Sequence, residues 1–223
     1  MQDKNGISTM KKVGFVVLGV AAIAALALLL GFASTGFSTV QGWVPFLWVL
    51  LASAIGLIAV WWLVAAEKPP LWLLTLVLAA GLLRLGVGTL WSVALPVLGH
   101  GTPAEQSGYV MGDAAGRDKA AWKLAKSDQP LWNAFTDHRK VDQYGGLLFL
   151  SAAIYRYLGG ENHQTLLIVV IGAACSALAV LFSWAFAKRL WGDKAAVIAA
   201  WAVCLYPEAI LLGSSQMREA FTI

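Results

Sequence analysis

Acidic side chains gather in one polar stretch of the chain. Residues 99–143 hold six of the twelve acids: Glu105, Asp113, Asp118, Asp128, Asp137 and Asp142. A carboxylate here could take a proton from a substrate hydroxyl or hold a metal. The structural alternative makes Asp113 the N-cap of a helix, with Arg117 one turn later as its ion-pair partner. The residues alone leave both roles open.

The residues that follow Asp113 have the pattern of an amphipathic helix. Lys119, Lys123 and Lys126 recur at i, i+4 and i+7. An apolar face accompanies them, made of Ala114, Ala121, Leu124 and Ala125. This pattern predicts a helix on a membrane surface, with its lysines toward water or lipid head groups.

The composition is that of a membrane protein. Charged residues make up 13% of the 223, against about 25% in soluble domains. The mean hydropathy is +0.72. The formal charge is +4, but the bases are scattered between apolar runs and form no phosphate-binding stripe. We therefore expect a lipid bilayer as partner and no nucleic acid.

Five apolar runs approach the roughly 20 residues that a membrane-spanning helix needs. They are Val13–Ala33, Val44–Ala66, Leu71–Leu98, Leu166–Ala187 and Ala195–Leu212. A shorter run, 144–158, carries Arg156 and suits an interfacial helix. The expected fold is all-α: a polytopic bundle of about five transmembrane helices, with an amphipathic interfacial helix in a large outer loop.

Basic residues set the expected orientation, because they are enriched in cytoplasmic segments. They precede the first span and lie between spans two and three and between spans four and five: Lys4, Lys11, Lys12, Lys68, Lys188, Arg189 and Lys194. We therefore expect a multi-pass protein of the inner membrane with a cytoplasmic N-terminus. The loop 99–143 and the segment Ser214–Glu219 are expected on the extracytoplasmic side.

Several motifs follow one another along residues 71–223. A span carries an arginine (Leu82-Leu-Arg84-Leu), and the outer loop contains Asp-Ala-x-x-x-Asp-x-x-Ala-x-x-Leu-Ala from Asp113. Tyr144 then begins Tyr-x-x-Leu-x-x-Leu-x-x-Ala-x-x-Arg-x-Leu-Gly. The last pieces are Ala187-Lys-Arg-Leu-Trp-Gly192 and Ser-Ser-Gln-Met-Arg-Glu219. In order and spacing, the chain resembles the N-terminal half of a GT-C glycosyltransferase of the dolichyl-phosphate-mannose protein mannosyltransferase and aminoarabinose transferase type.

The resemblance implies transfer of a sugar from a polyprenyl-phosphate-linked donor to an acceptor outside the cytoplasm. It assigns the catalytic role to Asp113, and we group Asp118 and Glu219 with it. The leaving phosphate needs cations, for which Arg117, Arg139, Lys140 and Arg218 are candidates. Arg84 and Tyr144 complete the candidate substrate-binding residues. A divalent metal is the only cofactor considered, and no Cys/His cluster marks a metal site.

Several alternatives stay open. Arg84 is either an interhelical contact or part of a substrate pocket. Arg218 and Glu219 could instead form a boundary pair at the membrane surface. His163 flanks a span and is interpreted as interfacial. If Arg84 and Asp113 line one path across the membrane, a transporter or flippase for lipid-linked glycans is favoured; a non-catalytic scaffold is the third possibility.

The resemblance also divides the chain. Residues 1–66 form the N-terminal segment and two additional spans, and 67–223 form the front part of the GT-C-like module, expected to be truncated at 223. The turn before the interfacial helix departs from the family's Pro-Pro-Leu, because Asp142-Gln-Tyr144-Gly145-Gly146 stands there.

Overall fold

Long helices dominate the computed structural model, which describes residues 4–35, 37, 42–136 and 142–221, with side chains from Val17 onward. Four helices are long and apolar enough to cross a membrane: α1 (Lys4–Ser34), α2 (Trp43–Leu63), α3 (Leu71–Leu98) and α8 (Leu166–Trp191). No strand occurs in the described ranges. The expected all-α membrane bundle is confirmed at this level.

The fifth expected span is broken. The sequence predicts one helix over Ala195–Leu212, but α9 (Asp193–Leu205) and α10 (Pro207–Gly213) meet at a bend of 53°. Pro207 causes the break, because it has no N–H to bond to an earlier carbonyl and it holds Tyr206 in an extended conformation. By length and composition, the described residues therefore hold up to five candidate spans, one of which is the broken pair α9 and α10.

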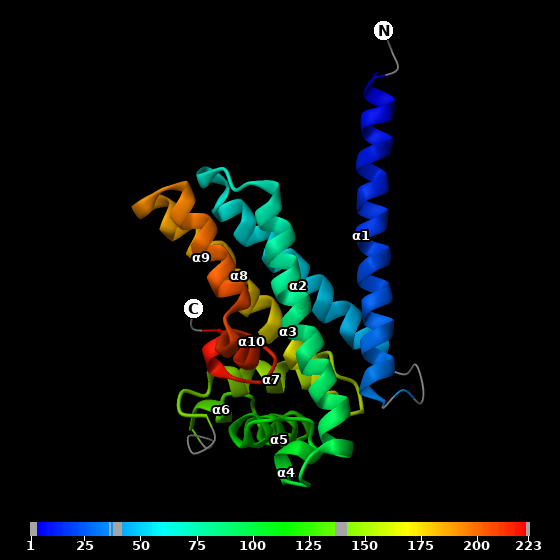
Figure 1. The fold of residues 1–223 in the computed structure, drawn as a ribbon. Coiled ribbons are helices and arrows are strands. Elements are labelled where there is room, and N and C mark those ends of the chain that lie inside the picture. Colours follow the sequence, from blue (N-terminus) through cyan, green and yellow to red (C-terminus); the bar gives the residue numbers. More distant parts are fainter. Residues whose placement is uncertain (1–3, 36, 38–41, 137–141, 222–223) are drawn as a thin grey trace.

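The helices alternate between two ends of the bundle (Figure 1). At one end, Glu67 in the short helix η1 (Ala65–Glu67) pairs with Arg189, 2.5 Å from carboxylate to Nη2. Lys188 also donates a hydrogen bond to the Glu67 carbonyl at 2.7 Å. The two basic loops thus lie together, as the charge pattern requires of loops on one side of a membrane.

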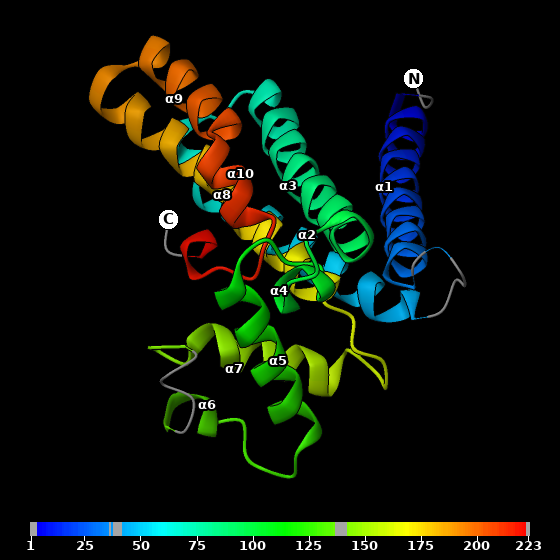
Figure 2. The same cartoon turned by 60° about the horizontal axis from the view of Figure 1, so that its bottom comes forward.

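The opposite end carries a layer of shorter helices, at the bottom of Figure 1. It contains α4 (Pro103–Gln106), α5 (Gly112–Lys126), α6 (Asn133–Thr136) and α7 (Gly146–Tyr157). Helices α5 and α7 pack against each other (Figure 2). The predicted apolar face of α5 is buried and its three lysines are exposed. Helix α7 occupies the run predicted to be interfacial.

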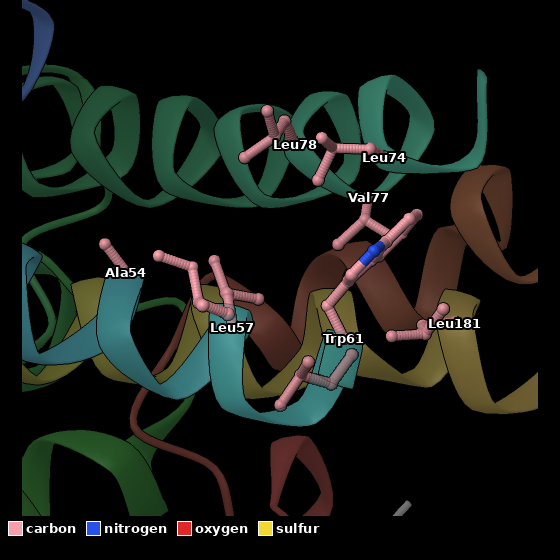
Figure 3. A pocket seen from close by; sticks show the side chains of 9 residues that line it. Ala54, Leu57, Trp61, Leu74, Val77, Leu78 and Leu181 are labelled. Carbon is pink, nitrogen blue, oxygen red and sulfur yellow. The ribbon is translucent and has the colours of Figure 1, made fainter. Parts of the chain in front are cut away.

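Helix α8 lies at the centre of the bundle and has the most continuous buried surface of the spans. Helix α1 packs through its last turns, where Gly31 lets α2 approach closely: a Cβ on Gly31 would lie 2.9 Å from that of Trp43. Between α2, α3 and α8, an apolar pocket of about 280 Å³ is walled by Leu57, Trp61 and Leu74 among others (Figure 3). It offers packing surface for apolar chains and no polar chemistry.

Candidate functional site

Charged residues from three separate segments meet at the layer of short helices α4 to α7, called the outer layer below because it contains the loop expected outside the cytoplasm. Asp113 lies in the first turn of α5 and Arg117 one turn later, while Arg218 and Glu219 belong to the short helix η2 (Arg218–Ala220). Asp142 precedes α7. The charges of all four other residues influence the pKa of Arg117. The structure therefore brings Asp113, Arg117, Arg218 and Glu219, all predicted site residues, into one charge cluster.

Arg117 is the centre of this cluster. Its side chain is 4% exposed, and its Nη1 donates a hydrogen bond to the Gln216 carbonyl at 2.5 Å. Burial lowers the pKa of Arg117, while Asp142, Glu219 and Asp113 oppose that effect. A guanidinium nevertheless stays charged. A permanent cation is thus held beneath the outer surface.

Asp142 is the buried carboxylate next to Arg117. Its Oδ2 accepts a hydrogen bond from the Leu148 backbone N–H at 3.0 Å, which fixes it to the first turn of α7. Its Oδ1 lies 3.9 Å from Arg117 Nε, beyond hydrogen-bond distance. Within the described chain, neither atom has a hydrogen-bond partner, which is rare for buried polar atoms.

A pocket of about 280 Å³ opens beside this pair. Its polar walls are Asp142, Tyr144 and Arg218, and its apolar walls include Leu147, Leu150 and Phe221. The Arg218 guanidinium lies 5.5 Å from the centre of the Tyr144 ring, a cation–π distance. An arginine and an aromatic ring in the lining of such a pocket suit a ligand with an anionic group and a flat or sugar-like ring.

Asp113 is exposed and lies in the first turn of α5 without capping it, since the helix begins at Gly112 and its N-cap is Met111. The N-cap alternative for Asp113 is therefore wrong. Negative charge in a first helical turn interacts favourably with the helix dipole, so the position suits an acidic side chain. Asp113 does not line the pocket but lies close enough to Arg117 to influence its pKa.

Asp118 faces a different part of the outer layer. One carboxylate oxygen accepts a hydrogen bond from the Tyr155 hydroxyl, and the other lies 2.9 Å from His163 Nε2. Burial, together with the negative charge of Asp118, raises the pKa of Tyr155 and of the neighbouring Tyr109 well above the ordinary value. Asp118 is 2% exposed and does not join the charge cluster.

Arg84 also lies apart. It is fully buried in α3, where its Nε donates to Ser176 Oγ at 2.9 Å and its Nη2 to the Val203 carbonyl at 3.1 Å. Nη1 donates to the Ala80 carbonyl at 3.0 Å and lies 3.5 Å from that of Cys204. The guanidinium thus meets carbonyls that the break at Pro207 leaves without helical partners. Of the two roles considered for Arg84, this geometry is that of a contact between helices.

Arg139 and Lys140 lie outside the described residues. So do Asp137 and His138. Among the residues that are described, no group of three His, Cys, Asp or Glu side chains is placed to hold a metal ion.

No family model, curated protein or solved structure matches this chain. The resemblance to GT-C enzymes rests on the sequence motifs.

Sequence reasoning did not single out three of the side chains that build this layer. The sequence places Asp142 among the outer-loop acids and in the turn before the interfacial helix, without assigning it a role. Gln216 is fully buried and joins the turn before η2 to α7, because its Nε2 donates to Ser151 Oγ at 2.6 Å. Arg156, seen as a charge inside an apolar run, donates to carbonyls at the end of α5, including that of Leu124 at 2.6 Å. Asp142 had a sequence signal, because it is an acid shortly before an expected helix. The contacts of Gln216 and Arg156 join distant segments, and no local pattern indicates them.

Proposed function

We propose that this chain is a membrane glycosyltransferase that moves a sugar from a polyprenyl-phosphate-linked donor to an acceptor on the extracytoplasmic side. The observation that supports this proposal is the pocket beside Arg218 and Tyr144, backed by the buried Arg117–Asp142 pair. Phosphate esters are bound by arginines, and a second cation behind the first strengthens that attraction. The apolar walls suit the start of an isoprenoid chain.

In this mechanism the bond between the sugar's anomeric carbon and the phosphate oxygen breaks. The acceptor hydroxyl forms the new bond, and its proton passes to a carboxylate. Asp113 and Glu219 are the exposed acids of the cluster. Asp113 takes the role of base, and Glu219 lies next to the phosphate-binding Arg218. Arg117 stabilises the negative charge of the leaving phosphate, and Asp142 positions Arg117.

Asp118 and Arg84 have other roles in this proposal. Both oxygens of Asp118 are engaged by Tyr155 and His163, so Asp118 supports the α5–α7 contact. Arg84 uses its donors within the bundle, as described above. A transport path through Arg84 and Asp113 therefore gains no support from the contacts of Arg84.

Donor binding tests the proposal directly. The chain is reconstituted in nanodiscs and titrated with a fluorescent polyprenyl monophosphate, the part common to all such donors. We expect Arg218→Ala to weaken binding at least tenfold and Arg218→Lys to restore part of it. Arg189→Ala, an arginine at the other end of the bundle that also pairs with an acid, is the matched control and should bind as the unaltered chain does.

Transfer is measured with donors carrying a radiolabelled sugar in membrane vesicles. Asp113→Asn should retain donor binding and lose transfer, because the amide cannot accept the proton. Equal binding by the Arg218→Ala and Arg189→Ala variants would contradict the assigned pocket. Absence of polyprenyl phosphate binding by the unaltered chain would favour the non-catalytic scaffold.

A further inference from the structure

A second polar pocket lies at the same end of the bundle, away from the charge cluster. It has a volume of about 290 Å³ and lies where α1 and α3 end and α8 begins. Its polar lining includes Ser34, Ser92, His163 and Gln164. It shares no described lining residue with the pocket beside Arg218. The proposed transferase mechanism does not use it.

Gln164 provides the first indication of a ligand. Its side chain lines the pocket and the residue is only 4% exposed. Its Nε2 donates a hydrogen bond to the Gly42 carbonyl at 3.1 Å, which fixes the orientation of the amide. Within the described residues, Oε1 is buried without a partner. A buried acceptor in this state gains free energy from any donor that reaches it.

The two serine hydroxyls also present acceptors. Ser34 donates its proton to the Gly31 carbonyl at 2.8 Å, and Ser92 donates its proton to the Thr89 carbonyl at 2.9 Å. These bonds use the one proton of each hydroxyl. Each serine oxygen keeps its two lone pairs and can accept a hydrogen bond.

His163 contributes an imidazole ring whose orientation is fixed by neighbouring side chains. Its Nε2 lies 2.9 Å from Asp118 Oδ2, and its ring stacks on Trp122 with centroids 4.7 Å apart. The Tyr155 ring packs against the imidazole nearly perpendicular to it, with centroids 5.2 Å apart, and about a third of the histidine side chain remains exposed. A neutral imidazole that donates Nε2–H to a carboxylate leaves Nδ1 as an acceptor.

We propose that this pocket binds the head group of a membrane lipid through hydroxyl or N–H donors, as in a glycerol or ethanolamine head group. Its oxygens and the imidazole offer acceptors, and no lysine or arginine is among its described lining residues, so it is poorly suited to a bare anion. Its place at the ends of spanning helices, with Val97 and Leu166 in the wall, points to a lipid as the source.

Lipid retention measured by native mass spectrometry tests the proposal. The purified chain is exchanged into nanodiscs of phosphatidylglycerol, phosphatidylethanolamine or phosphatidylcholine, whose quaternary ammonium has no N–H to donate. We expect at least tenfold stronger retention of one of the first two over phosphatidylcholine. Gln164→Met should abolish the preference. Gln106→Met is the matched control, because exposed Gln106 also donates its Nε2 to a glycine carbonyl, at 3.2 Å.

A double Ser34→Ala, Ser92→Ala variant gives an independent measurement if Gln164→Met does not fold. It removes two acceptors while the Gln164–Gly42 bond remains, so it should reduce the preference several-fold. Equal retention of all three lipids would overturn the proposal, as would an unchanged preference in both variants. Displacement of retained lipid by free ethanolamine or free glycerol would assign the pocket to a soluble ligand and overturn the lipid source.

Discussion

Arg117 Nε and Asp142 Oδ1 lie 3.9 Å apart beneath the outer surface, and among the described residues neither atom is hydrogen-bonded. The two charges attract each other but are not optimally joined. Each of these buried atoms can still form a hydrogen bond, either with a ligand or with the other atom after a small shift of the pair.

Removal of one partner of this pair should be costly. Asp142→Asn keeps the acceptor for the Leu148 N–H but removes the buried carboxylate charge that lies 3.9 Å from Arg117, the largest of the charges that stabilise this cation. We expect a loss of about 3–5 kcal/mol in the free energy of unfolding, measured by denaturation in detergent with tryptophan fluorescence. The double variant Arg117→Met, Asp142→Leu should recover most of it. Additive losses in the double variant would contradict this coupling.

Arg84 should be necessary for the broken helix. Arg84→Met leaves the carbonyls of Val203 and Cys204 without their donor at a depth where little water is available. We expect a loss of about 3 kcal/mol or more, seen as a lower denaturation midpoint. Ser176→Ala removes only one hydrogen-bond acceptor of Arg84 and should cost about 1 kcal/mol. A wild-type midpoint for Arg84→Met would rule out this role.

Tyr155 and Tyr109 should resist ionisation in the folded protein. Their pKa values are raised by burial and by the Asp118 charge, so the fold favours the neutral phenols. This contribution is complete below the ordinary tyrosine pKa near 10 and is lost as the pH rises from there toward the raised values. An absorbance titration at alkaline pH should therefore show two phenols that ionise only with unfolding. The double variant Tyr109→Phe, Tyr155→Phe should lack that late component, and an unchanged titration curve would refute the assignment.

The alternation of helix ends predicts which loops a membrane-impermeant reagent reaches. In a background without Cys175 and Cys204, single cysteines replace Gln106 or Glu161 at one end and Lys68 or Lys194 at the other. An impermeant maleimide should label the first two in intact cells and the last two only after permeabilisation. The reversed pattern would contradict the expected orientation while leaving the fold intact.

The sequence predicts the long helices well because lipid leaves few alternatives to an apolar helix of sufficient length. It placed α3 at its observed bounds and α2 within three residues at each end. The prediction of one unbroken helix over Ala195–Leu212 was wrong because it considered only hydropathy. Pro207 lies within this range and lacks a backbone N–H donor. The number of consecutive apolar residues says nothing about hydrogen bonding, so it does not indicate where a helix breaks.

The grouping of the acids in α5 was partly accessible from helix geometry. Residues four apart lie on nearly the same face and residues five apart do not. Asp113 and Arg117 therefore share one face, while Asp118 points elsewhere, toward Tyr155. The contact of Arg117 with Gln216 joins segments 99 residues apart, and no local pattern encodes it.

That long contact has a consequence for the order of assembly during synthesis. The outer loop leaves the ribosome well before Gln216, yet the buried guanidinium of Arg117 depends on the Gln216 carbonyl. Until the turn that contains Gln216 has packed against the outer loop, Arg117 must remain hydrated and the loop is not held in its final position. The charge cluster thus forms only after residue 219 has been synthesised, so a nascent chain stalled before residue 216 would display its outer loop without a finished pocket.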